Sequence, residues 1–165
     1  MPRPPRPPRP SRPSRAPRPP ATAPALDRTL SWRLHLLHKL TDQDSAHDYP
    51  QQVGLSMSDG RCLAAIGSFE PLSVKDLAQQ ANLNKSQASR AAQALVDQGL
   101  VCKQDRPDDG RGVVLTLTAA GRAAWQRTMA LIEQRNQQIV GCLDEPAQAT
   151  LSDLLDRLIA HNRHR

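Results

Sequence analysis

The feature that most constrains the fold is a pair of short helical patterns, followed by two β-prone stretches, within residues 73–118. The apolar residues of the first pattern recur at spacings of three and four, and they are Val74, Leu77, Ala78 and Ala81. The second pattern repeats this spacing with Ala88, Ala91, Ala92 and Leu95. Such spacing places the apolar residues on one side of a helix. The sequence therefore predicts two short amphipathic helices in tandem, each burying one stripe.

Both predicted helices begin and end at recognisable signals. Ser73 precedes Asp76 by three residues, and Asn84 precedes Gln87 by three residues. This is the arrangement of a capping box, in which two side chains pair with free backbone N–H groups. Gly99 follows the second helix and predicts a left-handed end to it.

The two β-prone stretches are Leu100–Gln104 and Val113–Leu117. Residues 105–112 between them are dense in Asp, Gly and Pro, which favour turns, so the segment predicts a β-hairpin. Two short helices followed by a hairpin form a winged helix-turn-helix. The predicted fold class is therefore mostly α with a small β-hairpin wing.

Helical periodicity accounts for most of the remaining chain. It predicts helices over Leu26 to Leu40, about 58–68, Thr118 to about Leu143, and from Glu145 onward. The polar stretch 41–52 contains Pro50 and predicts a loop. The last helix carries a wide apolar stripe made of Leu151, Leu154, Leu155, Leu158 and Ile159. Only four aromatic residues serve the whole chain, which favours packed helices over a sheet-based core.

Residues 1–24 form a segment of distinct composition. Eleven of the 15 prolines lie there, with six arginines and no acidic residue. Arginine recurs at every third position from 3 to 18, the period of a polyproline II helix. The segment predicts a disordered tail, which is either simply solvated, an over-long reading of the start, an arm that follows DNA phosphates, or a ligand for an SH3-like partner.

The excess positive charge of the chain lies in residues 1–24. The chain has 22 basic and 16 acidic residues, so the remainder has 16 of each and is formally neutral. The overall basic character therefore describes the tail, and on its own it does not show that the folded part binds nucleic acid.

Several classes of protein are disfavoured by the sequence. Cys62, Cys102 and Cys142 are widely spaced, so no zinc site, other metal site or cofactor is expected. Cys62 falls in an apolar helical pattern and Cys102 in a predicted strand, and both are expected to be ordinary buried cysteines rather than redox sensors. No apolar run is long enough to span a membrane and no secretory signal is found, so the expected location is the cytoplasm. No phosphate-binding loop or nucleophile motif suggests an enzyme.

The second short helix has the chemistry of a DNA-reading element. Its polar face is predicted to present Lys85, Ser86, Gln87, Ser89, Arg90 and Gln93. Gln and Ser can read base edges, and Lys and Arg can bind phosphates or guanine. An ordinary solvent-facing helix has a similar composition, so this signal alone leaves both interpretations open.

The turn of the hairpin strengthens the DNA-binding interpretation. Arg106 and Arg111 stand beside glycines, and a thin basic loop can enter a minor groove. Asp108 and Asp109 would oppose DNA if left bare, and they are expected to pair with these arginines and orient them. A plain turn that uses Asp and Gly for backbone geometry is the alternative.

Residues 72–118 resemble the MarR regulators. The stretch LSVKDLAQQANLNKSQASRAAQALVDQGLV is similar to their helix-turn-helix, and DRPDDGRGVVLTLT to their wing. The resemblance extends over about residues 26–163 and implies a MarR-type domain over 25–165. It places the winged helix-turn-helix at about 55–118 and N- and C-terminal dimerisation helices at about 26–46 and 119–163. It gives the recognition-helix role to Ser86, Gln87, Ser89 and Arg90, and the minor-groove role to Arg111.

The resemblance also implies partners. A homodimer would read a near-palindromic double-stranded operator, with half-sites roughly 34–36 Å apart. Many relatives respond to small aromatic acids, and the candidate ligand-binding residues here are Trp32, His35, His38, Arg61 and Cys62. An aromatic ring, imidazoles and a guanidinium can together hold an aromatic carboxylate. The alternatives are that Trp32 packs at an interface with the histidines solvated, and that the whole chain is a winged-helix protein-interaction module.

Overall fold

The computed structural model describes residues 25–105 and 112–163. The predicted tail at 1–24 lies outside the described residues. So do the predicted wing residues Arg106, Asp109 and Arg111. None of the described helices is long and apolar enough to cross a membrane.

The chain divides into two parts, residues 1–35 and residues 36–165. The first part contributes the short helix η1 (Leu26–Arg28) and the beginning of α1 (Leu30–Asp48). Within it, the Thr29 hydroxyl donates to the Leu26 carbonyl at 2.7 Å, and Arg33 Nε donates to the Asp27 carbonyl at 3.1 Å. These contacts join η1 to the first turn of α1.

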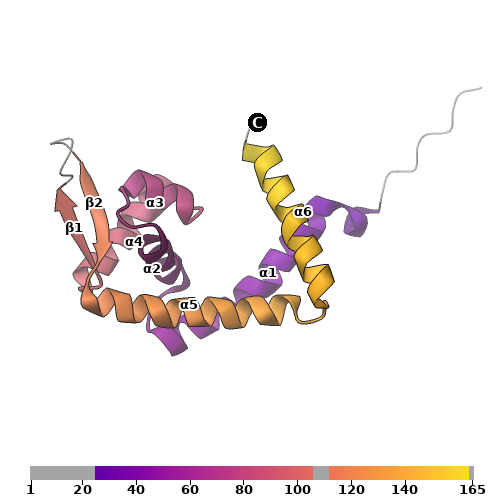
Figure 1. Cartoon of the computed structure of the whole chain (residues 1–165), viewed down its shortest axis with the longest axis horizontal. Coiled ribbons are helices and arrows are strands. Elements are labelled where there is room, and N and C mark those ends of the chain that lie inside the picture. The colour runs from indigo at the N-terminus through magenta and orange to yellow at the C-terminus, as the bar shows by residue number, and fades with distance from the viewer. Residues whose placement is uncertain (1–24, 106–111, 164–165) are drawn as a thin grey trace, which may run out of the picture. The chain divides into compact units, whose positions relative to one another are not determined.

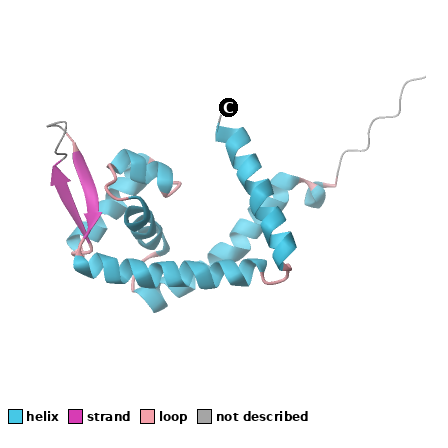
Figure 2. Cartoon of the chain, viewed as in Figure 1, coloured by secondary structure: helices cyan, strands magenta, loops and turns pink. Residues whose placement is uncertain are grey.

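The second part holds the rest of α1 and all the other elements (Figure 1). In chain order they are η2 (Tyr49–Val53), α2 (Met57–Phe69), α3 (Val74–Gln80), α4 (Lys85–Asp97), β1 (Val101–Asp105), β2 (Val113–Leu117), α5 (Ala119–Val140) and α6 (Glu145–Arg163). The predicted fold class is confirmed, since the described chain is mostly helical with one two-stranded hairpin (Figure 2).

The core of the second part forms around α2. Leu63 and Ile66 of α2 are fully buried, together with Leu77 of α3, Leu95 of α4 and Leu115 of β2. The predicted stripe of α4 is confirmed, because its four apolar residues are all buried. On α3 only Leu77 is fully enclosed, while Val74 and Ala78 are partly buried at the edge of the core.

The hairpin pairs β1 with β2 in antiparallel register, from Val101 opposite Leu117 to Asp105 opposite Val113. A third segment joins the sheet through one residue, because Leu72 bridges Leu115. The two predicted strands are confirmed to within a residue. The bridge between Leu72 and Leu115 was not predicted, because a single paired residue has no periodicity in the sequence.

The predicted helix signals are largely confirmed. Asn84 and Gln87 form a complete capping box at the start of α4. At α3 the Asp76 N–H donates to the Ser73 hydroxyl, but the Asp76 carboxylate accepts from that same hydroxyl at 2.7 Å, so only half of the expected box forms. Gly99 adopts a positive φ of 69°, as expected for the left-handed end of a helix.

The loop predicted over 41–52 is wrong. The helix α1 continues to Asp48, and η2 adds a further wide helical turn. Pro50 stands at the start of that turn, where a missing N–H is tolerated. Tyr49 and Val53 are buried and tie the segment to the core. Two apolar anchors four residues apart are too sparse a signal to distinguish this stretch from a loop.

We predict that Gly121→Ala lowers the free energy of unfolding by about 1–3 kcal/mol. A Cβ at Gly121 would overlap the backbone carbonyl of Leu100, where the start of α5 crosses the start of β1. Elsewhere in a helix, Gly→Ala stabilises by about 1 kcal/mol, so the clash reverses the usual sign. Urea denaturation measures the change.

The matched control is Ala123→Ser, an exposed position on the same helix, which should change stability by less than about 0.5 kcal/mol. A Gly121→Ala protein as stable as the wild type would show that α5 does not approach β1 this closely.

Candidate nucleic-acid interface and ligand cavities

The turn between α3 and α4 has a fixed geometry. Asn82 adopts a positive φ of 53°, a conformation that Asn tolerates better than most residues. The Leu83 N–H then donates to the Ala78 carbonyl at 2.8 Å, and the Asn84 side chain caps α4. The turn therefore sets the direction in which α4 leaves α3.

The helix α4 buries alanine and exposes polar side chains. Ala88, Ala91 and Ala92 are at most 4% exposed, and such small residues allow the helix to approach its scaffold closely. The five residues predicted for DNA contact are all exposed, and they are Lys85, Ser86, Gln87, Ser89 and Arg90. The structure thus places the predicted set on the solvent side of one amphipathic helix.

Two of these side chains already have intramolecular partners. Gln87 Oε1 accepts from the Asn84 N–H at 3.1 Å, which leaves the side-chain NH2 group of Gln87 as a donor. Arg90 Nε donates to the Ser86 carbonyl at 3.4 Å, so the side chain lies back along the helix. Binding a base edge would use the remaining donors of each group.

Gln93 connects α4 to the wing, a contact that the sequence did not signal. Its Oε1 accepts from Lys103 Nζ on β1 at 2.6 Å, and its Nε2 donates to the Asp97 carboxylate at 2.7 Å. Helical periodicity placed Gln93 on the polar face of α4. Its partner Lys103 could not be foreseen, because it depends on where the hairpin docks.

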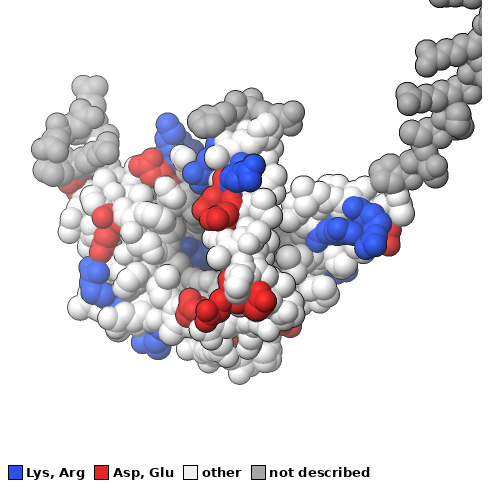
Figure 3. All heavy atoms as spheres, turned by 45° about the vertical axis from the view of Figure 1, so that its right-hand side comes forward, with Lys and Arg blue, Asp and Glu red and all other residues white. Residues whose placement is uncertain are grey.

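The elements that would face DNA are nearly neutral. Residues 74–105 carry four basic side chains, Lys75, Lys85, Arg90 and Lys103, and three acidic ones, Asp76, Asp97 and Asp105. On the face of the molecule shown in Figure 3, basic and acidic side chains are interspersed. A contact between these elements and DNA would depend on individual groups more than on a broad positive field.

An acidic residue brings together two predicted ligand-binding residues. Asp42 of α1 pairs with Arg61 of α2 at 2.6 Å and with His38 at 3.3 Å, measured between nitrogen and oxygen. The Arg61 side chain is 39% exposed, so the pair is open to solvent on one side. Sequence reasoning selected His38 and Arg61 but missed the carboxylate that joins them.

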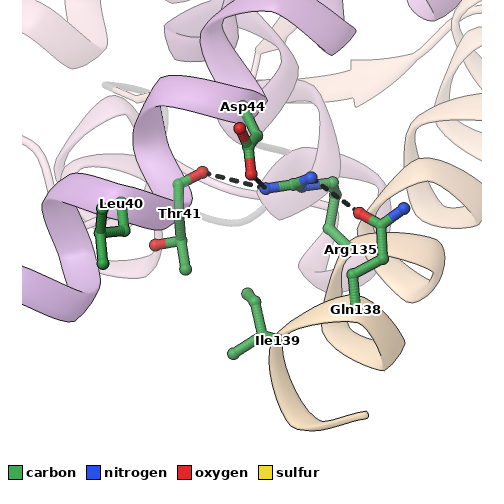
Figure 4. A pocket seen from close by; sticks show the side chains of 6 residues that line it. All are labelled: Leu40, Thr41, Asp44, Arg135, Gln138 and Ile139. Carbon is green, nitrogen blue, oxygen red and sulfur yellow. Dashed lines mark hydrogen bonds and ion pairs between the residues drawn. The ribbon is translucent and has the colours of Figure 1, made fainter. Parts of the chain in front are cut away.

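Arg135 of α5 is the centre of a second polar cluster (Figure 4). Its guanidinium nitrogens lie 3.1 Å from the Asp44 carboxylate and 3.5 Å from that of Asp48. It also donates to the Thr41 carbonyl at 3.2 Å and to Gln138 Oε1 at 2.7 Å. The side chain is only 11% exposed, and its Nε–H has no partner among the described residues. No pattern in the sequence predicts this cluster, because Arg135 is more than 90 residues from Thr41 and Asp44.

Three open cavities adjoin these clusters. The Arg135 cavity, of about 320 Å³, is lined by Leu40, Thr41, Asp44, Arg135, Gln138 and Ile139. The Tyr49 cavity, of about 270 Å³, lies between α1, η2, α2 and α5, and Tyr49, Arg61 and Ile132 are among the residues that line it. The Phe69 cavity, of about 340 Å³, lies between α2, the end of α3 and α5. Arg61 and Ile132 line both of the last two cavities, so the Arg61 guanidinium stands where they meet.

The Phe69 cavity combines apolar surface with a cation. Phe69 is 54% exposed although it is a large apolar side chain. Met129 and Ile132 of α5 add apolar surface, while Arg61 and Asn82 supply polar groups. This is the composition of a small-molecule site, which is mostly apolar with a few polar groups that fix orientation.

Cys62, which was predicted near a ligand, lies in the core. It is fully buried and lines none of the three cavities. Burial, with a smaller effect from the Asp59 charge, raises the pKa of the Cys62 thiol to about 11. The thiol therefore stays protonated, which fits the expected ordinary buried cysteine and not a redox sensor. Of the other two, Cys102 is half-buried with its Sγ 3.0 Å from Thr116 Oγ1, and Cys142 is exposed.

The remaining predicted ligand residues, Trp32 and His35, belong to the first part of the chain. Both are exposed, and Trp32 is 37% accessible to solvent. In the second part, the described residues contain no group of three side chains suited to hold a metal ion.

A family model and a curated relative both indicate one class of protein, the bacterial helix-turn-helix regulators. Residues 53–112 match the model of the MarR family, a range that includes α2, α3, α4 and β1. The HTH-type transcriptional repressor Rv2887 of Mycobacterium tuberculosis is 27% identical over 106 residues, covering 64% of this chain and 76% of the relative.

Solved structures agree on the fold. A probable transcriptional regulator from Pseudomonas aeruginosa is 26% identical and superposes with a TM-score of 0.65, over 81% of this chain and 99% of that one. The structure of Rv2887 with salicylic acid is 24% identical, with a TM-score of 0.66, over 80% and 97% of the two chains. Bordetella bronchiseptica BpsR, described with regulation of its DNA binding by 6-hydroxynicotinic acid, is 21% identical, with a TM-score of 0.63, over 76% and 98%.

Proposed function

Because the chain belongs to the MarR family of transcriptional regulators, we propose that it is a homodimeric repressor that binds a near-palindromic DNA operator and is released by a small aromatic acid. The observation that carries the DNA-binding part is the polar face of α4, which stands over a buried alanine stripe beside a β-hairpin. This is the arrangement that lets a helix enter a major groove.

In this proposal α4 reads the operator. Ser86, Gln87 and Ser89 would contact base edges, and Arg90 would bind guanine or a phosphate. Lys85, at the first residue of α4, would contact the backbone of the duplex. All five side chains are exposed, which supports these roles.

The wing and the tail would supply contacts that the described residues do not. Arg106 and Arg111, with Asp109 to orient them, are proposed to meet the minor groove. The six arginines of residues 1–24 are proposed to add nonspecific affinity for phosphates. The near-neutral balance of residues 74–105 supports this division, because binding to DNA generally requires several phosphate contacts.

The proposed dimer rests on an apolar helix face that nothing in the described chain covers. The helix α6 has no buried residue. Its exposed apolar residues share one face, and they are Leu151, Leu154, Leu155, Leu158 and Ile159. Exposed apolar surface of this extent marks an interface, and a second copy of the chain would cover it with an identical face.

The proposed effector site is the Phe69 cavity with Arg61 at its edge. Arg61 uses one nitrogen, Nη2, for Asp42, so its other N–H groups can meet a ligand carboxylate. Phe69, Met129 and Ile132 would contact the aromatic ring. The solved complex of Rv2887 with salicylic acid, and the regulation of BpsR by 6-hydroxynicotinic acid, suggest the ligands to try first. His38, which pairs with Asp42 beside Arg61, is a further candidate, while Trp32 and His35 of the first part stay predictions from the sequence.

A second candidate is a winged-helix module that binds protein rather than DNA. The near-neutral composition of residues 74–105 favours this alternative. The DNA-binding experiment below distinguishes the two.

We predict that the chain binds DNA from upstream of its own gene at least about 10³-fold more tightly than scrambled DNA at the same salt concentration. Arg90→Ala and Arg111→Ala should each weaken specific binding about 10- to 100-fold, while removal of residues 1–24 should weaken binding to both DNAs. Fluorescence anisotropy measures all four proteins. Gln98→Ala, at an exposed position after α4, is the control.

Salt dependence identifies the contribution of the tail. Six neutralised phosphates would contribute about 5 to the slope of log K against log salt for each chain, so the truncated protein should show a much shallower slope. If the wild type binds both DNAs with equal affinity, and only removal of residues 1–24 changes that affinity, the result would favour the protein-interaction module.

We predict that Leu155→Glu converts a dimer into a monomer, because it puts a charge into the apolar face of α6. Sedimentation equilibrium should give twice the 18.1 kDa chain mass for the wild type and a single chain mass for the variant. Ala160→Glu, which lies on the opposite side of α6 by helical spacing, should remain dimeric. A wild type that is monomeric at micromolar concentration would contradict the proposed dimer.

We predict that salicylic acid and 6-hydroxynicotinic acid bind with measurable heat and weaken DNA binding. Arg61→Met removes the guanidinium but retains most of the stem, so it should lower ligand affinity roughly 10- to 100-fold. Arg127→Met, on the exposed side of α5, is the control, because among the described residues Arg127 bonds only the Ala123 carbonyl of its own helix. No heat from either acid, and no effect on DNA binding at millimolar ligand, would refute this effector class.

A further inference from the structure

The carboxylate of Glu70 joins three elements of the second part. Glu70 follows the last residue of α2, and its side chain is 20% exposed. Oε2 accepts from the Leu117 N–H of β2 at 2.7 Å, and Oε1 accepts from the Arg122 guanidinium of α5 at 2.7 Å. One side chain therefore connects the end of α2, the base of the wing and the start of α5.

The contact with Leu117 continues the sheet. Leu72 and Leu115 exchange two backbone hydrogen bonds, of 3.2 and 2.8 Å. In an antiparallel ladder the next bonded pair lies two residues further along each strand, which places residue 70 opposite Leu117. At that position the Glu70 side chain, and not a backbone carbonyl, accepts from the Leu117 N–H. The carboxylate thus takes the place of the next residue of a third strand.

The Leu117 N–H lies where it needs a partner. Leu117 is 8% exposed, and Val101 opposite it is 2% exposed. Buried backbone donors in native proteins are almost always paired, and here the carboxylate is the partner that the structure provides. Arg122 is 53% exposed, so its main effect is to hold the carboxylate in the orientation that serves Leu117.

We propose that Glu70 is a positioning residue for DNA binding, which fixes the base of the wing through the Leu117 N–H. The inference rests on the proposed DNA-binding function. The strand β2 leads from the tip of the hairpin to Leu117, so the anchoring of its last residues sets the direction of both strands. On the other side of the hairpin, the link from Lys103 to Gln93 joins exposed side chains, and solvent competes with it. Glu70 and Leu72 therefore form the firmer attachment.

Two conservative variants separate length from charge. Glu70→Gln keeps the length and one acceptor oxygen but loses the charge, so it can still accept from Leu117. Glu70→Asp keeps the charge but is one methylene shorter, so its carboxylate falls short of the Leu117 N–H. If the contact with the Leu117 N–H positions the wing, Glu70→Gln should keep DNA binding and Glu70→Asp should weaken it.

Amide hydrogen exchange of Leu117, followed by NMR, reports the contact directly. We expect exchange at Leu117 to accelerate at least about tenfold in Glu70→Asp and to change little in Glu70→Gln, with the Leu115 amide as an internal reference. Anisotropy with the operator DNA should give a Kd about tenfold higher for Glu70→Asp and near the wild-type value for Glu70→Gln. Thermal unfolding, measured in parallel, confirms that the binding assay is run on folded protein.

Arg122→Met and Glu133→Gln complete the set. Arg122→Met removes the ion pair alone and should affect Leu117 exchange less than Glu70→Asp does. Glu133 of α5 accepts from Gln137 of the same helix, so Glu133→Gln controls for the loss of one negative charge.

Two results would overturn the proposal. One is a folded Glu70→Asp protein whose Leu117 amide exchanges faster than in the wild type, but which binds the operator as tightly as the wild type. The other is the reverse order, with Asp equal to the wild type and Gln impaired, which would show that pairing with Arg122 matters and the sheet contact does not. A wild type without preference for its operator would instead refute the proposed function and this role with it, while the Leu117 exchange data would still show whether Glu70 anchors the hairpin.

Discussion

The burial of one face of α2 is the interaction on which the rest of the second part depends. Leu63 and Ile66 are fully enclosed, and α2 packs against η2, α3, α4, α5 and β2. Burying each of these side chains contributes about 1.5–3 kcal/mol. Because α2 is shared by all of these elements, its position decides where α4 presents its polar face and where the hairpin stands. The alanine stripe of α4 then sets how closely that helix approaches α2.

Two polar contacts of functional interest lie at the edge of the apolar core that forms around α2. Near the start of α2, Arg61 leaves the core and meets Asp42 of α1. At its end, Glu70 reaches Leu117 and Arg122. A carboxylate or guanidinium inside that core would lose its hydration with little in return. At the edge of the core, Arg61 and Glu70 each have a partner and stay partly solvated. The helix therefore joins the Tyr49 and Phe69 cavities, both of which Arg61 lines, to the base of the wing, which Glu70 contacts.

How far the sequence predicts this arrangement depends on the range of the interaction. The stripe of α4 and its capping box at Asn84 are local patterns, and both were predicted correctly. The wide turn at Tyr49 was missed, because its anchoring comes from burial against other elements. The pairs Asp42–Arg61 and Glu70–Leu117 could not be predicted, since their partners are 19 and 47 residues apart. No periodicity links positions that only the packing of α2 brings together.

The same distinction applies to the proposed site. The polar face of α4 follows from spacing, because amphipathicity is a property of one helix. The lining of a cavity does not follow from spacing, because a cavity collects residues from several elements. Cys62 is the next residue after Arg61, yet its side chain is fully buried in the core. Phe69 and Met129 were not selected, although they supply the apolar surface that a ring would need.

Charge is distributed unevenly along the chain. A protein that binds DNA mainly through a broad positive surface gains affinity for every sequence alike. Here residues 74–105 are close to neutral, while six arginines without any acid stand in residues 1–24. On the proposed function, the two requirements of an operator-binding protein are therefore separated along the chain. The folded residues discriminate between sequences through individual contacts, whose geometry depends on α4 and the anchored wing. The arginines raise affinity for any duplex, and they do so in a way that salt weakens. A near-neutral reading face is then compatible with DNA binding, because the general attraction to phosphate does not have to come from the same residues that read the bases.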